Sequence, residues 1–528
     1  MALDSLASFV SALLVCSSLL YQVSLWQRKE YRFDRIRSFI FSQENNICHD
    51  HPLIIGWLLL GLAWLGYFFI DETRAELLAW LALAAFVVHH SLRIRRFGIY
   101  RPTWTVKSIV ACATALALTA LYVVLAIMPG VLLATQAATM IFFMPAVCAL
   151  AIILTNIPFG LRKLAVVKKA TQKRRHMPKL KVVGITGSYG KTSTKHFLSQ
   201  ILDLLKKPHV ATPNHCNSYY AVAKHFLGSV KNDTSLYVAE MGAYRSGEIR
   251  QLANIVQPTI ATVIAVSNQH LSLFGSPEKL LEAKWEIVEA LPKEGVGVIN
   301  DDDIRLKQKS TGLTTKAIRF STTHQADVWL ENMAVHDRLI AGTLHIGPYS
   351  QPVQIPLISV GLAQSALAAA ATAWALSLDE AAIADSLQKL VAMPRTMAGQ
   401  LTAQNAFIID DSYSGGEHAA LNAIRHLKYF TQKDKRIAFV PIIELGGQAE
   451  RVHEAIGNAM AQANALILIY GTAYQTHITR GLGAKAKDAI WFTDPAAFAE
   501  ALASNLTADS VLLLEGRVPS LARKALGV

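Results

Sequence analysis

Residues 182–194, VVGITGSYGKTST, have the composition of a loop that binds nucleotide phosphates. Gly187 and Gly190 let backbone N–H groups close around phosphate oxygens, and the start of the following helix adds a positive dipole end. Lys191 can reach the β- and γ-phosphates, and the Thr192 hydroxyl can bind Mg²⁺. Ile185 stands where the common pattern has its first glycine, so an ordinary glycine turn is the alternative reading. We interpret the run as a nucleotide site.

The rest of residues 182–528 alternates apolar, β-branched runs with helix-like stretches, which is typical of parallel sheets buried on both faces. Their spacing predicts a P-loop parallel-sheet central domain at 182–395 and a Rossmann-like C-terminal domain at 396–528. We expect helices such as 277–291 and 419–430 between strands at 235–243, 259–266, 295–300, 406–412, 436–443, 465–471, 489–494 and 511–516.

Ligands in such sheets bind at the carboxyl ends of the strands. Polar residues stand at three of these ends. Glu240 closes one strand, Asn300-Asp301-Asp302 another and Asp410-Asp411 a third. These residues are therefore the candidates that complete a site around the phosphate loop.

The first third of the chain is different in composition. Residues 1–181 hold 20 of the 51 Lys and Arg but only 8 of the 38 Asp and Glu, so they carry most of the net +13 charge. The nearly neutral remainder gives no reason to expect nucleic-acid binding. Apolar runs, most of them near the 20 or so residues needed to cross a bilayer, lie at 3–26, 52–70, 75–92, 105–127 and 131–154.

From these runs we expect a helical transmembrane domain at 1–161, of about five helices, followed by a basic cytoplasmic linker at 162–181. Arg and Lys gather in alternate loops, which by the positive-inside rule places the N-terminus outside. A tight or re-entrant hairpin would reduce the spans to three without changing the orientation. The expected location is thus the inner (cytoplasmic) membrane, multi-pass, with the catalytic domains in the cytoplasm.

The five cysteines form no C-x-x-C pair, so neither a disulfide scaffold nor a zinc site is indicated. Three of them, Cys16, Cys112 and Cys148, lie in the apolar runs.

Several motifs, in order, resemble those of the Mur ligases, the ATP-dependent amide ligases of peptidoglycan synthesis. TGSYGKTST at 186–194 has the Mur form of the phosphate loop, and TPNHCNSYYAV at 212–222 resembles the substrate-side Asn loop. VAEMGAYRSGEI at 238–249 and SNQHLSLFGSPEKLLEAKWEI at 267–287 follow, the latter the most specific stretch. The C-terminal motifs DDSYSGG and ELGGQAERVH begin at 410 and 444. Within the family the chain is most similar to the members that add D-alanyl-D-alanine.

The resemblance implies catalytic roles for Lys191, Lys284, His270 and Arg395. It implies metal binding by Thr192, Glu240, His270 and Lys284, with Lys284 falling on the lysine that these enzymes carbamylate. ATP-binding residues implied are Thr186, Gly187, Ser188, Gly190, Lys191, Thr192, Ser193, Asn300, Asp302 and Asp411. Substrate-binding residues implied are Asn217, Ser218, Ser412, Tyr413, Glu444 and His453. The expected cofactors are ATP and Mg²⁺.

These residue types suit the chemistry. A Mur ligase phosphorylates a carboxylate with ATP, and an amine then attacks the acyl phosphate. Metal ions shield the phosphate charge, and a lysine stabilises it in the transition state. Without the resemblance, His270 is a loop histidine and Lys284 a solvated helix lysine.

The chain also departs from the family. The family's UDP-binding N-terminal domain is absent, and its adenine segment appears as GLAQSAL at 361–367, without His and Asn. The hinge-side arginine is shifted to Arg395, Ser414 replaces an asparagine, and Glu515 replaces a basic residue.

We therefore predict a membrane-anchored ATP-dependent carbon–nitrogen ligase. Its partners are a nucleotide, an amino acid or dipeptide as amine donor, a carboxylate acceptor and the membrane, with no nucleic acid. One hypothesis is a UDP-linked muramoyl peptide as the acceptor. The second is the same chemistry on a lipid-linked or polymer-bound carboxylate, and the third is an ATP-binding regulatory or scaffold protein that has lost catalysis.

Overall fold

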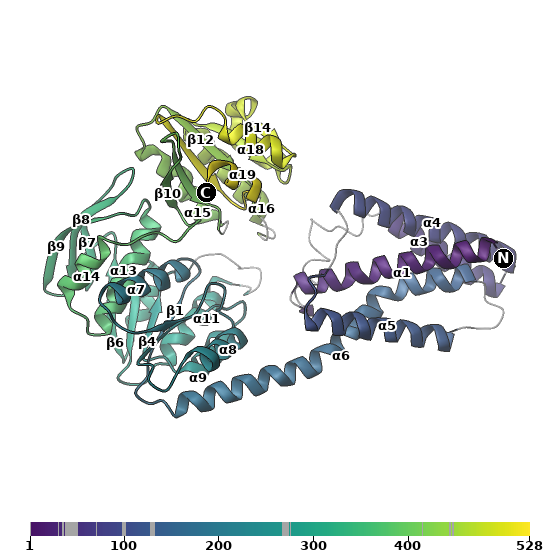
Figure 1. The fold of residues 1–528 in the computed structure, drawn as a ribbon, viewed down its shortest axis with the longest axis horizontal. Coiled ribbons are helices and arrows are strands. Elements are labelled where there is room, and N and C mark those ends of the chain that lie inside the picture. The colour runs from purple at the N-terminus through teal and green to yellow at the C-terminus, as the bar shows by residue number, and fades with distance from the viewer. Residues whose placement is uncertain are drawn as a thin grey trace. The chain divides into compact units, whose positions relative to one another are not determined.

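The structure is a computed structural model. It describes residues 2–29, 31–33, 36, 51–69, 71–97, 102–126, 133–266, 274, 276–413, 416–442, 445 and 448–528. The chain divides by its contacts into two units, Met1–Ala165 and Val166–Val528 (Figure 1). Each unit is described by itself.

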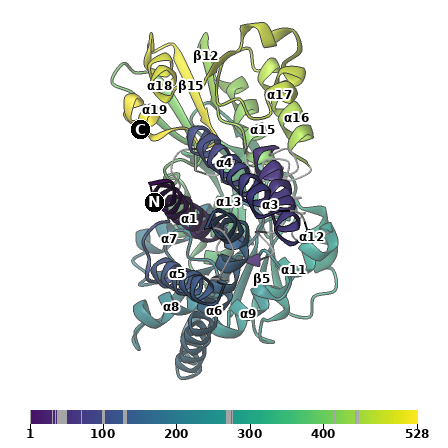
Figure 2. The same ribbon diagram turned by 90° about the vertical axis from the view of Figure 1, so that its right-hand side faces the viewer.

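The first unit is helical. Its apolar side chains pack around small residues such as Ala63, Ala79 and Ala115, which let helices approach closely. Helices α3 and α4 lie side by side (Figure 2), and Gly56 of α3 faces the ring of Phe86 on α4. The helices are α1 (Ala2–Arg28), α3 (His51–Phe69), α4 (Glu72–Phe97), α5 (Val106–Ala126) and α6 (Leu133–Arg175). Residues 162–175, expected in a basic linker, continue α6.

The second unit begins with a sheet in the order β2-β3-β1-β4-β5-β6-β7-β8-β9. The ladder from β2 to β7 is parallel, and β7, β8 and β9 extend it as antiparallel strands. The strands are β1 (Lys181–Thr186), β2 (Val210–Ala211), β3 (Leu236–Glu240), β4 (Ile260–Val263), β5 (Val296–Asn300), β6 (Lys316–Ser321), β7 (Val328–Val335), β8 (Ile340–Ile346) and β9 (Tyr349–Ile355).

Helices cover both faces of this sheet, so its central strands are buried throughout. The alanine-rich α13 packs closely beside α7, and Thr262 of β4 shares a buried hydrogen bond of 2.8 Å with Thr372 of α13. The helices are α7 (Lys191–Leu204), α8 (Tyr219–Ser229), α9 (Glu248–Val256), α11 (Pro277–Glu289), α12 (Ile304–Ser310), α13 (Val360–Ala375) and α14 (Glu380–Leu387).

Local sequence fixes where several of these helices begin. Ser276 accepts a hydrogen bond from the Lys279 N–H at the start of α11, and Pro277 occupies the first helical position. Ser359 caps α13 and Asp379 caps α14 in the same way. The caps satisfy backbone donors that a helix end leaves without partners.

A second sheet, in the order β10-β11-β15-β12-β13-β14, is parallel except for the antiparallel edge strand β10. Its strands are β10 (Ala398–Leu401), β11 (Phe407–Asp411), β12 (Asp434–Phe439), β13 (Leu466–Tyr470), β14 (Ile490–Phe492) and β15 (Ser510–Glu515). Its helices are α15 (Glu417–His426), η3 (Leu427–Tyr429), α16 (Ala449–Gln462), α17 (Gln475–Leu482), η5 (Gly483–Asp488), α18 (Pro495–Ala503) and α19 (Ser520–Leu526). The predicted α/β class with parallel sheets is confirmed.

Candidate active site at the carboxyl edge of the central sheet

The phosphate-loop residues connect β1 to α7, with Gly190 as the residue before the helix. Gly190 has a left-handed φ of 77°, and a Cβ added there would lie 3.0 Å from the Ser365 hydroxyl and 3.1 Å from the side chain of Ile264. Glycine is therefore required at this turn. Thr186 is fully buried, and its hydroxyl donates to the Met241 carbonyl, so it ties β1 to β3.

Lys191 folds back over the loop. Its Nζ donates to the carbonyl oxygens of Gly187 at 2.7 Å and Ser188 at 3.3 Å. Burial lowers the pKa of Lys191, and the charge of Glu240 opposes that shift. In the described part of the chain, the hydrogen bonds of this ammonium group go to neutral oxygens, which anionic phosphate oxygens can replace. Ser193 follows in the first turn of α7.

Glu240, at the end of β3, is the centre of the site. It is almost fully buried, at 2% exposure. Its Oε1 accepts hydrogen bonds from Thr192 Oγ1 and Asn217 Nδ2, both at 3.2 Å, and its Oε2 forms an ion pair with Lys195 at 3.0 Å. Burial alone would raise the pKa of Glu240, but Lys195, Lys191 and Asn217 together hold it below its ordinary value. The group is therefore an anion at neutral pH.

Lys284, on α11, is buried beside this cluster. Its ammonium lies 5.9 Å from the centre of the Phe274 ring, and no hydrogen bond or ion pair reaches it from the residues that the structure describes. Burial, and then the charge of Lys191, lower the pKa of Lys284 to about 7, although Glu248 and Glu286 oppose the shift. Much of this amine is uncharged near neutral pH.

The carboxylates around Lys284 are engaged elsewhere. Glu286 accepts hydrogen bonds from the Gly247 and Arg250 N–H groups, at 2.6 and 2.9 Å, and Glu248 accepts one from the Tyr244 N–H at 2.7 Å. Both therefore hold backbone near the start of α9. A cavity of about 50 Å³ reaches Lys284 and is lined by Gly187, Ser188, Lys191, Asn217, Gly242, Ala243, Tyr244, Phe274, Leu280 and Lys284.

Asn300, which was expected to bind ATP, is buried and forms hydrogen bonds at the ends of two strands. Its Nδ2 donates to the Ile264 carbonyl at 2.7 Å, and its Oδ1 accepts from the Asp302 N–H at 2.9 Å. It thereby joins the ends of β4 and β5.

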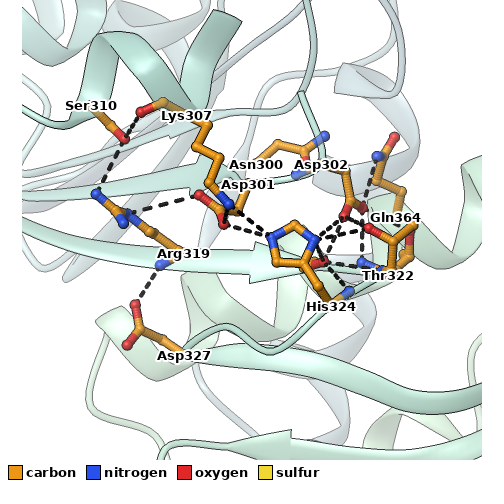
Figure 3. A network of polar contacts seen from close by, with 12 residues as sticks. Asn300, Asp301, Asp302, Lys307, Ser310, Arg319, Thr322, His324, Asp327 and Gln364 are labelled. Atoms are coloured by element: carbon orange, nitrogen blue, oxygen red, sulfur yellow. Dashed lines mark hydrogen bonds and ion pairs between the residues drawn. The ribbon is translucent and has the colours of Figure 1, made fainter. Parts of the chain in front are cut away.

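Neighbouring residues that the sequence did not indicate fill the hydrogen-bonding capacity of the Asp302 carboxylate (Figure 3). Its carboxylate accepts hydrogen bonds from the hydroxyls of Ser321, Thr322 and Thr323, at 2.5 to 2.7 Å, and from the Thr322 N–H at 2.8 Å. Gln364, in the segment that departs from the family, donates at 3.4 Å. Burial would raise the pKa of Asp302, but these bonds outweigh it and lower the pKa. The run of hydroxyl residues at the end of β6 could have indicated these contacts from the sequence.

The second sheet brings three predicted residues together. Arg395 donates from Nε to Ser412 Oγ at 3.1 Å and from Nη2 to the Ser412 carbonyl at 2.6 Å. The Tyr413 N–H donates to the Arg395 carbonyl, and the Tyr413 ring stacks on His215 with centroids 5.3 Å apart. His215 lies two residues before Asn217, so this contact links the second sheet to the substrate-side loop.

Asp411, expected to bind ATP, is buried opposite Glu515. The two residues are register partners on the parallel strands β11 and β15. Asp411 accepts from the Met397 N–H at 3.1 Å, but neither oxygen of Glu515 has a hydrogen-bond partner in the described part of the chain. Burial raises the pKa of Asp411 to about 7 and that of Glu515 well above its usual range, with the charge of Asp411 adding to the latter.

Other predicted residues do not join the cluster. His453 is fully buried, its Nδ1 bonded to the Ala449 carbonyl and its Nε2 accepting from the Ile442 N–H, with Tyr474 stacked on its ring. Both nitrogens are occupied, so its geometry fits a core histidine rather than a substrate ligand. Ser218 is exposed at the start of α8. His270 and Glu444 lie outside the described residues.

The donors around Glu240 fit Mg²⁺. Hydroxyl and carboxylate oxygens from Thr192 and Glu240 are hard ligands, and Mg²⁺ is commonly held by one or two such groups together with water and substrate phosphates. No group of three or more His, Cys, Asp or Glu that could hold a metal ion occurs among the described residues.

The comparisons with known proteins agree with this architecture. Residues 185–373 match the family model for the Mur ligase middle domain. A Mycobacterium bovis protein named UDP-N-acetylmuramoyl-tripeptide–D-alanyl-D-alanine ligase is 28% identical over 302 residues, which span 56% of this chain and 59% of that protein. The Escherichia coli K12 protein of the same name is 29% identical over 321 residues, 60% of this chain and 69% of its own.

Solved structures share the fold. A crystal structure of MurF from Acinetobacter baumannii superimposes with a TM-score of 0.63 at 24% identity, covering 69% of this chain and 81% of that one. MurF from Thermotoga maritima, crystallised in complex with ADP, gives 0.61 at 24% identity, covering 69% and 84%.

Together, the matches indicate the class of this part of the chain, since residues 185–373 match a Mur ligase middle domain. The chain is similar to Mur ligases of the MurF type.

The expected location, in the inner membrane as a multi-pass protein, is wrong. The relatives are named as UDP-N-acetylmuramoyl-tripeptide–D-alanyl-D-alanine ligases, and these names do not place them in a membrane. Among the described residues only two helical stretches, Thr73–Leu92 and Ala138–Arg175, are long and apolar enough to cross a membrane. Core helices of soluble proteins share that length and composition, so the transmembrane domain expected at 1–161 stays a prediction. The membrane and a lipid-linked acceptor also lack support from the relatives.

Proposed function

We propose that the chain is an ATP- and Mg²⁺-dependent ligase that joins an amine to a carboxylate. The observation that carries the proposal is the contact between Thr192 and Glu240 at 3.2 Å, which joins the phosphate loop to a buried anionic strand end. Asn217 binds the same carboxylate from the substrate-side loop. Phosphate, metal and acceptor would therefore meet at one point.

The proposed reaction has two steps. An acceptor carboxylate oxygen attacks the γ-phosphorus of ATP, the bond to the β-phosphate oxygen breaks, and ADP leaves. The amine nitrogen then attacks the acyl carbon, phosphate leaves, and the nitrogen loses a proton as the amide forms. Mg²⁺, held by Thr192 and Glu240, would neutralise phosphate charge. Lys191 would leave the loop carbonyls and stabilise the transferring phosphoryl group.

Arg395 and Tyr413 are proposed to belong to the amine side of the site. They bond to each other through the backbone, and Tyr413 contacts His215 of the substrate-side loop. Arg395 has a left-handed φ of 67°. Residues 182–395 and 396–528 are accordingly proposed as the central and C-terminal domains, joined at this strained residue.

Lys284 is proposed to carry a carbamate. An uncharged lysine adds CO₂ to its nitrogen and releases one proton, which leaves an anionic group on the side chain. The pKa of about 7, the lack of an ion-pair partner in the described residues and the adjoining cavity all favour this reaction. The product would supply the second carboxylate-like group that the cluster around Glu240 lacks.

The relatives' names suggest the substrates: a UDP-N-acetylmuramoyl tripeptide as the acceptor and D-alanyl-D-alanine as the amine. Purified protein with ATP and Mg²⁺ should release ADP and phosphate only when both are present, and the product mass should equal the sum of the two minus water. No turnover with this pair, or with other peptide carboxylates and amino acids, would overturn the assignment.

A nucleotide-binding protein without ligase activity is the second candidate. The saturation of Asp302 by Ser321, Thr322 and Thr323 favours it, because little of that carboxylate remains for a nucleotide ribose. Tight ADP binding without turnover for any carboxylate and amine pair would support this candidate over the first.

A further inference from the structure

We propose that Lys195 is a positioning residue that keeps Glu240 from binding a divalent cation tightly until a nucleotide is present. The inference rests on the proposed function, in which Glu240 is a metal ligand. It assigns a role to a side chain that the phosphate-loop pattern does not include.

The first observation is a buried ion pair. The Lys195 side chain is 5% exposed, and its Nζ lies 3.0 Å from Glu240 Oε2. The same Nζ donates to the Pro213 carbonyl at 3.3 Å. Lys195 is thus fixed between the strand end and the substrate-side loop, and its charge cannot move away without leaving Glu240 buried and unpaired.

The second observation is the contrast with Lys191, one helical turn earlier on α7. Among the described residues, the Lys191 ammonium bonds to two carbonyls of its own loop, at 2.7 and 3.3 Å. This ammonium group can turn toward phosphate oxygens at a small cost in free energy. Lys195 bonds instead to the Glu240 carboxylate, so the two lysines bind different groups.

The third observation is that the two carboxylate oxygens of Glu240 have different partners. Oε2 is taken by Lys195, whereas Oε1 faces Thr192 and Asn217. A cation held through Oε1 would feel the repulsion of the Lys195 ammonium in a poorly solvated site. Nucleotide phosphates add negative charge and offset that repulsion. Metal binding should therefore depend on the nucleotide.

The test measures Mn²⁺ binding to the nucleotide-free full chain by electron paramagnetic resonance. Removing the charge with Lys195→Met should tighten Mn²⁺ binding about tenfold. Lys195→Arg, which retains the charge, should bind as the wild type does. Lys224→Met, at an exposed lysine of α8, is the matched control and should also change nothing.

Two further variants keep the test decisive. The double variant Lys195→Met/Glu240→Gln should lose the gain, because the ligand is gone. If Lys195→Met does not fold, Lys195→Gln removes the charge but retains a hydrogen-bond donor, and it should tighten Mn²⁺ binding too. With ATP present, kcat should fall several-fold in Lys195→Met and recover in Lys195→Arg, since only the arginine still orients Glu240.

Unchanged Mn²⁺ affinity in folded Lys195→Met or Lys195→Gln would overturn the inference, and so would an Arg variant that tightens binding as Met does. The binding measurement needs no turnover. A wild-type protein that lacks ligase activity therefore removes the proposed function, whereas the Mn²⁺ result alone decides the role of Lys195.

Discussion

Asp411 and Glu515 lie opposite one another on parallel strands, and both carboxyl side chains are buried. Two negative charges in this position would repel each other strongly, so the pair must retain a proton. One retained proton keeps the pair from carrying two negative charges.

This pair predicts a loss of stability at higher pH. The folded state raises the pKa of Asp411 from an ordinary value near 3.8 to about 7. The folded chain therefore binds protons that the unfolded chain has released, and stability falls as pH rises from about 4 through 7. The effect is on the order of 2–4 kcal/mol. Hydrogen exchange of peptides covering β11 and β15, measured between pH 5 and 8, should show faster opening at the higher pH.

Glu515→Gln should flatten this pH dependence, because it removes a buried acid whose pKa burial raises well above its ordinary value. Glu500→Gln, at an exposed position of α18, is the control and should keep the wild-type slope. An identical slope in Glu515→Gln would show that the pair does not share a proton.

Gly190→Ala should weaken nucleotide binding and lower the melting temperature. The left-handed backbone costs about 1–2 kcal/mol with a Cβ, and the new atom would crowd Ser365 and Ile264. Gly228→Ala is a matched control because that helical glycine faces open space; it should be neutral or stabilising by up to about 1 kcal/mol. ADP binding by calorimetry and thermal unfolding would compare the two. Equal behaviour would mean that the loop tolerates a side chain.

Lys191→Ala should reduce turnover by at least about 10²-fold, because it removes a positive group aimed at the charge that develops during phosphoryl transfer. Lys207→Ala, at an exposed lysine beyond the same helix, should leave turnover unchanged. Initial rates of ADP release measure both. Retained turnover in Lys191→Ala would show that the loop is a structural turn without a role in phosphoryl transfer.

Lys284→Ala should lose most activity if the lysine carries a carbamate, and short-chain carboxylates in the assay should restore part of it. Lys284→Arg should not be rescued, since its bulk and fixed charge fill the site. Lys279→Ala, at an exposed position of the same helix α11, should behave as the wild type does. Near-normal activity of Lys284→Ala would remove this residue from the site.

Much of the fold could be predicted because buried parallel strands have an unmistakable apolar composition. The expected strands at 235–243 and 295–300 correspond to β3 and β5, with Glu240 and Asn300 at their ends. The antiparallel extension β7 to β9 was missed. Its outer positions alternate between buried and half-exposed, so no continuous apolar run marks it.

Contacts between residues far apart in the chain could not be predicted from the sequence. Nothing local shows that Lys195 meets Glu240, 45 positions later, or that Asp302 is filled by hydroxyls from the end of β6.

The Glu240 carboxylate binds Thr192 of the phosphate loop and Asn217 of the substrate-side loop through one oxygen. Under the proposed function, a nucleotide and an acceptor both act on this carboxylate, so their binding is coupled. By thermodynamic reciprocity, whatever factor the nucleotide imposes on acceptor affinity, the acceptor must impose on nucleotide affinity. The Glu240 side chain then determines whether the two ligands strengthen or weaken each other's binding.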